Sequence, residues 1–193
     1  MSKSKIPPAG SPLAGPATLA DRVAALHNER DAFLDALARL APAERTATPA
    51  PGKWSPVEIA EHVYRVEAVT LRGLERQLAA GDARRDVGPH SRAGVVLLLA
   101  AMRSPKQLEM PGGARGIAPE GMGYEAVRAA WAELPARWDA AVASFPEALE
   151  RTPLLRHPVA GALTLDDALR FLAAHTSRHR RQLARAARGG STA

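Results

Sequence analysis

At residues 54–62 the chain reads Trp54-Ser-Pro-Val-Glu-Ile-Ala-Glu-His62, which is its clearest helix start. Ser55 is a favoured N-cap residue, Pro56 fits the first helical position, and Glu58 stands at the third, so the three form a capping box. Gly81 suits the position just after the helix end. Between these signals a mainly apolar stripe recurs every three or four positions, with Thr70 as its polar member: Ile59, Val63, Val66, Thr70, Leu74 and Leu78. This spacing predicts one long amphipathic helix.

Two further segments, before and after this one, have the same helical periodicity. The first opens at Thr18, with Asp21 in its first turn, and is expected to run until Pro42 stops it. The other spans residues 124–145. Pro135 lies inside that span and should kink or split the helix, because proline lacks a backbone donor and clashes with the preceding turn. No segment has the sustained period-two alternation of a strand.

A fourth helix opens at Thr164, has Asp167 three residues later, and is expected to end at Gly189-Gly190. A stretch of about forty residues, 82–123, separates the second and third long helices, and such a crossover is needed when the middle helices of a bundle run parallel. Within it, residues 92–103 predict a short helix that is too short to span a membrane and is expected to be buried. The sequence therefore predicts an all-α fold: a four-helix bundle with a long crossover between helices two and three and a short extra helix near 92–103.

The 193 residues suffice for one domain. Residues 1–17 are rich in proline, glycine and alanine and are predicted to form a flexible arm, residues 18–188 a single helical bundle, and residues 189–193 a disordered tail. The N-terminus lacks the apolar core of a signal peptide, and no apolar run has the length of a membrane span. We expect a cytoplasmic protein with no membrane partner.

The net charge of +6 would favour a nucleic-acid partner, but its distribution argues against one. Residues 1–20 carry two lysines and no acid, and residues 178–193 carry five arginines and no acid, which leaves a charge of −1 on residues 21–177. Aromatic residues make up only 4% of the chain and do not alternate with basic ones, so no stacking platform for single strands is predicted. A nucleic-acid accessory role through the arginine-rich end is therefore the least favoured hypothesis.

The absence of cysteine excludes disulfides, thiolate nucleophiles and cysteine-based metal sites. Histidines offer another ligand set. His175 and His179 stand at i and i+4 on the apolar face of the last helix, and His62 borders the apolar stripe of the second. Three neutral imidazoles with an open position are a common site for a catalytic divalent metal, although an i, i+4 histidine pair in so basic a segment also fits a solvated face. Thr176 stands where a zincin protease needs glutamate, which argues against that chemistry.

Two more residues are candidates near such a site. Gln182 lies one turn beyond His179, where it could hydrogen-bond a metal-binding histidine or simply face solvent. Arg30 lies on the apolar stripe of the first helix, where it could bind a substrate carboxylate or extend its stem to solvent. His27 and His90 have no partner pattern and are expected at the surface or in loops.

Three stretches together resemble the DinB/YfiT-like superfamily. Residues 54–62 are similar to its Trp-Ser/Thr-x-x-Glu-x-x-x-His pattern. His157-Pro-Val-Ala-Gly-Ala-Leu-Thr-Leu165 resembles the turn before its last helix, and Phe171-Leu-Ala-Ala-His-Thr-Ser-Arg-His-Arg-Arg-Gln-Leu183 resembles its His-x-x-x-His-x-x-Gln. The match covers roughly residues 18–188, in the family's order. His157 itself is expected to be structural.

This resemblance implies a four-helix bundle that is often dimeric, and a divalent metal (nickel, zinc or iron) held by His62, His175 and His179. Known relatives include thiol-dependent transferases and isomerases that use bacillithiol, mycothiol or glutathione. The expected function is therefore a metalloenzyme of the thiol-dependent S-transferase, isomerase or hydrolase type, acting on a small molecule with a low-molecular-weight thiol as one candidate partner. The alternative is a non-catalytic, metal-stabilised stress-response bundle. Residues 105–123 match weakly, so the resemblance does not name the substrate.

Overall fold

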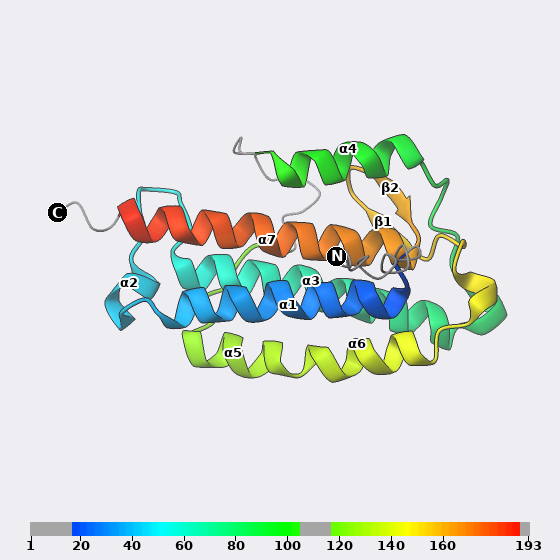
Figure 1. Cartoon of the computed structure of the whole chain (residues 1–193), viewed down its shortest axis with the longest axis horizontal. Coiled ribbons are helices and arrows are strands. Elements are labelled where there is room, and N and C mark those ends of the chain that lie inside the picture. Colours follow the sequence, from blue (N-terminus) through cyan, green and yellow to red (C-terminus); the bar gives the residue numbers. More distant parts are fainter. Residues whose placement is uncertain (1–16, 105–116, 190–193) are drawn as a thin grey trace, which may run out of the picture.

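A computed structural model describes residues 17–104 and 117–189. Four helical rods lie side by side in it: α1, α3, the consecutive pair α5 and α6, and α7 (Figure 1). Their bounds are Leu19–Ala38 for α1, Pro56–Ala79 for α3, Tyr124–Ala132 for α5, Leu134–Ala143 for α6 and Leu165–Gly189 for α7. The predicted four-helix bundle is therefore confirmed. The predicted arm and tail, apart from residues 17 and 189, lie outside the described residues.

Several shorter elements pack around this bundle or connect its helices. They are helix α2 (Pro42–Thr46), helix α4 (Arg92–Arg103), 3-10 turns at Gly81–Ala83 and Glu147–Leu149, and a hairpin of β1 (Leu155–His157) and β2 (Gly161–Leu163). The hairpin was not predicted, because strands of three residues are too short to show period-two alternation. Among the described helices, none combines the length and apolar character that crossing a bilayer requires.

The middle rods run in the same direction, as the long crossover required. On α3, Glu67 accepts a hydrogen bond from Trp131 of α5, and further along Glu75 pairs with Arg137 of α6. The partner numbers rise together along both rods, so α3 and α5–α6 are parallel. Between α3 and α5 the chain must therefore run back along the length of the bundle. Helix α4 lies on this return path, outside the four rods (Figure 1).

The predicted capping signals set the helix starts. The Ser55 hydroxyl accepts from the Glu58 backbone N–H at 3.4 Å, and the Glu58 carboxylate accepts from the Ser55 N–H at 2.7 Å. Gly81 follows the end of α3 with a φ of +52°, the left-handed conformation that glycine adopts without strain. The first helix ends at Ala38, earlier than expected, and Pro42 instead opens α2.

Pro135 splits the third rod, as predicted. Helix α5 ends at Ala132, and α6 begins at Leu134, so the proline lies in the first turn of α6. Proline is tolerated there because the first N–H groups of a helix have no intrahelical acceptor. The two pieces remain neighbours and continue one rod along the bundle (Figure 1).

Helix α4 is buried on one face only, which corrects the expectation of a buried helix. Val95, Leu98 and Leu99 pack into the core, whereas Val96 and Leu97 are 64% and 70% exposed. The helix packs on α7 and against the hairpin turn. This apolar helix therefore packs on the outside of the bundle. Because all sides of the segment are apolar, its sequence did not indicate which face would pack against the core.

Candidate metal centre

Helices α3 and α7 bring the three predicted histidines together. The ring centroids of His62 and His175 are 5.2 Å apart, those of His62 and His179 are 5.0 Å apart, and those of His175 and His179 are 4.4 Å apart. One ring nitrogen from each residue lies within 4.8 Å of the others. The i, i+4 spacing places two rings on one face of α7, and the packing of α3 against α7 supplies the third.

The cluster lies in an apolar and aromatic environment. His62 is 5% exposed and His175 is 7% exposed. The Trp54 ring lies 4.9 Å from the His62 ring, and the Phe171 ring lies 5.3 Å from the His175 ring, centroid to centroid. The tryptophan that opens the α3 signature and the phenylalanine that opens the α7 signature therefore both pack against the histidines.

Hydrogen bonds fix the tautomers of two of these rings. His62 Nδ1 donates to the Ile117 carbonyl at 2.9 Å, and His179 Nδ1 donates to the Gln182 side-chain oxygen at 2.8 Å. A carbonyl oxygen only accepts, so Nδ1 carries the proton in each ring and Nε2 keeps its lone pair. Metal-binding histidines are held by such bonds in many sites. Gln182 is thus placed as the partner of His179.

Burial keeps all three rings neutral at physiological pH. It lowers the pKa of His62, against the opposing effect of the hydrogen bond to Ile117. It lowers the pKa of His175 well below its ordinary value, with further contributions from His179 and His62. For His179, burial and then the neighbouring His62 lower the pKa to about 3. Neutral imidazole is the form that binds a metal ion.

These residues fit a divalent metal of the zinc, nickel or iron group. Such ions suit imidazole nitrogen, and a nitrogen set is what a chain without cysteine can offer. His175 Nδ1 is buried and has no hydrogen-bond partner among the described residues. A buried polar atom without a partner is costly, and a cation held between the rings would be compatible with it. His62, His175 and His179 are accordingly the residues that could hold the ion.

Glu61 is a functional candidate that the sequence reasoning missed. Its side chain is fully buried, and its carboxylate accepts three backbone N–H groups: those of Glu120 at 2.6 Å, Gly121 at 3.0 Å and Met122 at 2.8 Å. Gly121 has a φ of +93°, which allows the turn that points these groups at one carboxylate. An acidic residue on the buried side of a helix needs a hydrogen-bond or ionic partner. The position of Glu61, next to His62 on α3, was the one sequence feature that could have indicated its role.

Arg30 is placed in the core, away from solvent. It is 1% exposed, and its guanidinium pairs with the Glu67 carboxylate. Trp131 and Trp138 donate their indole N–H groups to the same carboxylate at 2.7 and 3.0 Å. The expectation that the Arg30 stem extends to solvent is therefore wrong. In this structure Arg30 binds the carboxylate of Glu67, whereas the sequence had suggested the carboxylate of a substrate.

The other histidines have local roles. His157 Nδ1 accepts from the Val159 and Ala160 N–H groups, both at 3.2 Å, which closes the hairpin turn and confirms a structural residue. His90 lies in the loop before α4, as expected, and its Nε2 is 2.8 Å from an Asp167 oxygen. His27 is half-buried, and its Nε2 lies 3.7 Å from Asp139.

Comparisons with known proteins bear on the fold and on the family. A solved structure titled "Crystal structure of TT2238, a four-helix bundle protein" superposes with a TM-score of 0.56 at 24% identity, over 87% of this chain and 99% of that chain. At this identity the likeness shows the fold alone. Curated proteins give no significant match. The family model described as DinB superfamily matches residues 25–183, and the chain therefore belongs to the DinB superfamily.

Proposed function

We propose that this chain is a metal-dependent enzyme in which His62, His175 and His179 hold a divalent ion, nickel, zinc or iron. The reaction class is transfer, isomerisation or hydrolysis on a small molecule, with a low-molecular-weight thiol as cosubstrate. One observation carries the proposal: ring nitrogens of three histidines from two helices lie within 4.8 Å of one another, and two of these histidines, His62 and His175, are buried.

Each surrounding residue has a definable task in this proposal. The Ile117 carbonyl and Gln182 orient His62 and His179 and hold the proton on Nδ1. Trp54 and Phe171 restrict water around the rings. A bound divalent ion with an open position lowers the pKa of a coordinated water or thiol. Because the chain has no cysteine, a thiolate has to arrive with a cosubstrate, and the cytoplasm, where we place the protein, keeps such thiols reduced.

The burial of His62 and His175 favours a second candidate, a closed metal site that only ties α3 to α7. Cobalt-substituted protein separates the two. If the site is open to a thiol, adding 2-mercaptoethanol produces a thiolate-to-cobalt absorption band that His179→Ala lacks. If the spectrum is unchanged while chelation lowers the melting temperature strongly, the enzyme proposal fails and the structural site is supported.

A further inference from the structure

A recess lies on the opposite side of α7 from the histidines. It has a volume of about 470 Å³ and is bounded by α1, α4 and α7. On α7 its lining includes Ala173 and Ser177, each two residues from a histidine of the cluster. Two residues correspond to about 200° around an α-helix, so this recess and the histidines occupy opposite faces of α7. We call it the α1–α4–α7 groove.

Small side chains create the groove. Ala25 of α1 and Ala173, Ala174 and Ser177 of α7 line it, and Met102 of α4 borders it. Small residues at a seam between helices leave space that larger side chains would fill. The surface of the groove is therefore partly apolar, as in most small-molecule sites, and its volume lies within their usual range of roughly 300–1,000 Å³.

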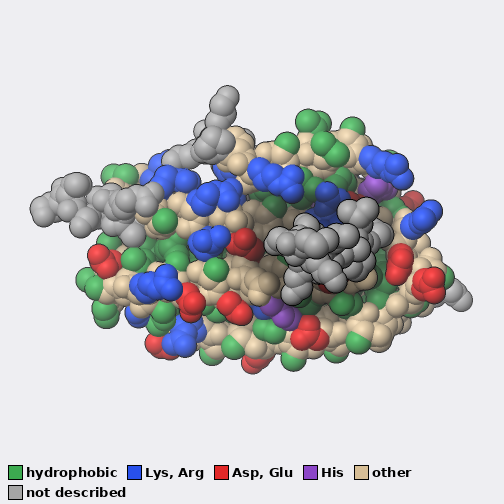
Figure 2. Space-filling model, viewed as in Figure 1, with side chains coloured by type: hydrophobic (Ala, Val, Ile, Leu, Met, Phe, Trp, Pro, Cys, Tyr) green, Lys and Arg blue, Asp and Glu red, His purple; other side chains and the backbone are tan. Residues whose placement is uncertain are grey.

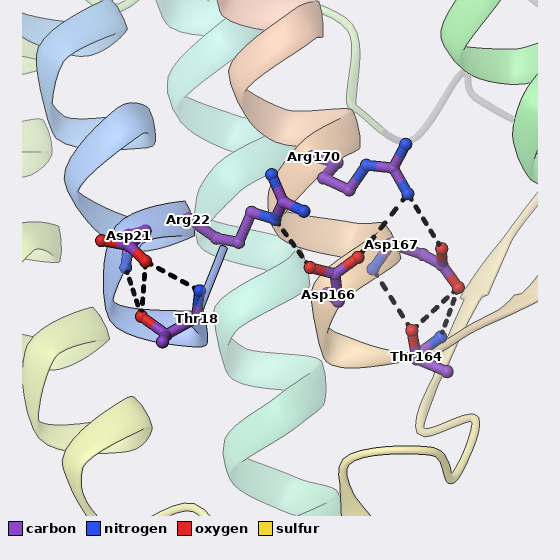
Figure 3. A network of polar contacts seen from close by, with 7 residues as sticks. All are labelled: Thr18, Asp21, Arg22, Thr164, Asp166, Asp167 and Arg170. Carbon is purple, nitrogen blue, oxygen red and sulfur yellow. Dashed lines mark hydrogen bonds and ion pairs between the residues drawn. The ribbon is translucent and has the colours of Figure 1, made fainter. Parts of the chain in front are cut away.

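Arginine side chains surround the apolar part of the groove. Figure 2 shows Lys and Arg side chains along the line where α4 meets α7. At one end, Arg22 pairs with Asp166 at 2.7 Å, and Arg170 lies 3.6 Å from the other oxygen of the same carboxylate (Figure 3). Asp166 thus offsets much of the positive charge at this end of the groove.

The other end has positive charge without such compensation. Arg103 and Arg181 line it, and none of the ion pairs between described residues involves either one. Arg181 donates to the Met102 carbonyl at 3.0 Å and to the Ser177 hydroxyl at 3.3 Å, which places its guanidinium beside α4 without neutralising it. Glu29, the acid that lines the groove, is paired with Arg180 at 3.2 Å.

We propose that the α1–α4–α7 groove binds an amphiphilic organic anion, namely a carboxylate with a short aliphatic tail. The carboxylate pairs with Arg103 and Arg181, whose guanidinium groups offer forked donors suited to it. The aliphatic tail lies over Ala25, Ala173 and Ala174. This site is separate from the histidine cluster and does not depend on the function proposed for it.

The test is calorimetric titration of the full chain with octanoate, with acetate and 1-octanol as ligands that lack the tail or the charge. Octanoate should saturate at about one molecule per chain, and both truncated ligands should bind at least about tenfold more weakly. Arg103→Gln with Arg181→Gln should weaken octanoate binding about tenfold or more. Ala173→Leu, which fills the floor, should weaken it as well. Arg128→Gln on α5, where Arg128 pairs with Glu125, is the matched control and should bind like the wild type.

Several outcomes would overturn the proposal. The first is that octanoate does not bind to the wild type. The second is that acetate binds with the same affinity as octanoate, which would mean a simple anion site. The third is that the Arg103→Gln/Arg181→Gln variant binds octanoate with the affinity of the wild type. Loss of octanoate binding in His179→Ala, with the groove variants unaffected, would place the ligand at the histidines instead. Arg103 is exposed at the end of α4, so Arg103→Gln alone gives a folded protein in which the charge contribution can still be measured.

Discussion

Glu61 and His62, consecutive residues of α3, bind the same segment of the crossover. The Glu61 carboxylate accepts the N–H groups of residues 120–122, and His62 Nδ1 donates to the Ile117 carbonyl. The segment from Ile117 to Met122 is thereby fixed to the helix that supplies one of the three clustered histidines. The conformation of the crossover and the orientation of the His62 ring are consequently coupled.

Replacing Glu61 should therefore affect both stability and metal binding. Glu61→Ala leaves three N–H groups without their carboxylate, and the free energy of unfolding should fall by about 2–3 kcal/mol. Zinc affinity should fall about tenfold or more, because the acceptor that orients His62 is no longer held. Urea unfolding and competition with a zinc chelator measure the two effects. Glu150→Gln is the control, because the Glu150 side chain is exposed and lies outside the segment that Glu61 and His62 hold; equal zinc affinity in Glu61→Ala and this control would contradict the coupling.

The buried pair of Arg30 and Glu67 should show strong non-additivity. Arg30→Met leaves the Glu67 carboxylate buried with only the two indole donors, and unfolding free energy should fall by about 3–5 kcal/mol. Adding Glu67→Gln to Arg30→Met removes the uncompensated charge while an amide oxygen still accepts from tryptophan, so part of the loss should be recovered. Urea denaturation of both single variants and the double variant measures this; simple addition of the two losses would show that the pair is not coupled.

Metal-free protein should lose stability as the pH falls from 7 to 5. The pKa of His175 is well below its ordinary value and that of His179 is about 3, whereas both titrate near 6.5 in an unfolded chain. Between these values the unfolded chain binds protons that the folded chain does not, so the free energy of unfolding decreases as the pH drops below about 6.5. Each histidine that stays neutral contributes about 2 kcal/mol to the decrease between pH 7 and 5.

The variant His175→Leu/His179→Leu tests the origin of this pH dependence. It retains the carboxylates and the remaining histidines but lacks the two most strongly perturbed groups. Its unfolding free energy, measured in urea at both pH values, should decrease less than that of the wild type. An identical decrease in the two proteins would mean that other groups control acid sensitivity.

Gly94 allows α4 to approach the hairpin closely. A Cβ atom at this position would lie 2.9 Å from the Ala160 carbonyl oxygen, a backbone atom that cannot turn aside. Gly94→Ala should therefore lower the free energy of unfolding by about 1–3 kcal/mol. Gly123→Ala is the control, because a Cβ there meets no atom within 4 Å and its φ is −74°. Equal melting temperatures for the two variants would show that α4 is free to shift.

Local signals explain which features could be predicted. The caps at Thr18 and Ser55, the split at Pro135 and the spacing of His175 and His179 all depend on residues within one turn of each other. The assembly of three histidines could be proposed because His175 and His179 lie on an apolar stripe, His62 borders one, and apolar stripes meet in a bundle core.

Features that depend on distant partners could not be predicted in the same way. Glu61 meets backbone groups about sixty residues further along the chain, and Arg30 meets Glu67 only after α1 packs beside α3. A charged residue in an apolar stripe indicates that a partner exists, but it does not identify that partner. For Arg30 the sequence therefore left two alternatives, a substrate carboxylate and solvent. The structure shows a third, the buried carboxylate of Glu67.

Elemental analysis of tag-free protein tests the central claim most directly. After chelation, reloading with zinc and removal of excess ion, the wild type should retain about one metal ion per chain. The variant His62→Ala/His175→Ala/His179→Ala should retain almost none, while His27→Ala, which changes a histidine outside the cluster, should match the wild type. A wild type that retains no metal, or a triple variant that retains as much as the wild type, would contradict a metal centre at these three histidines.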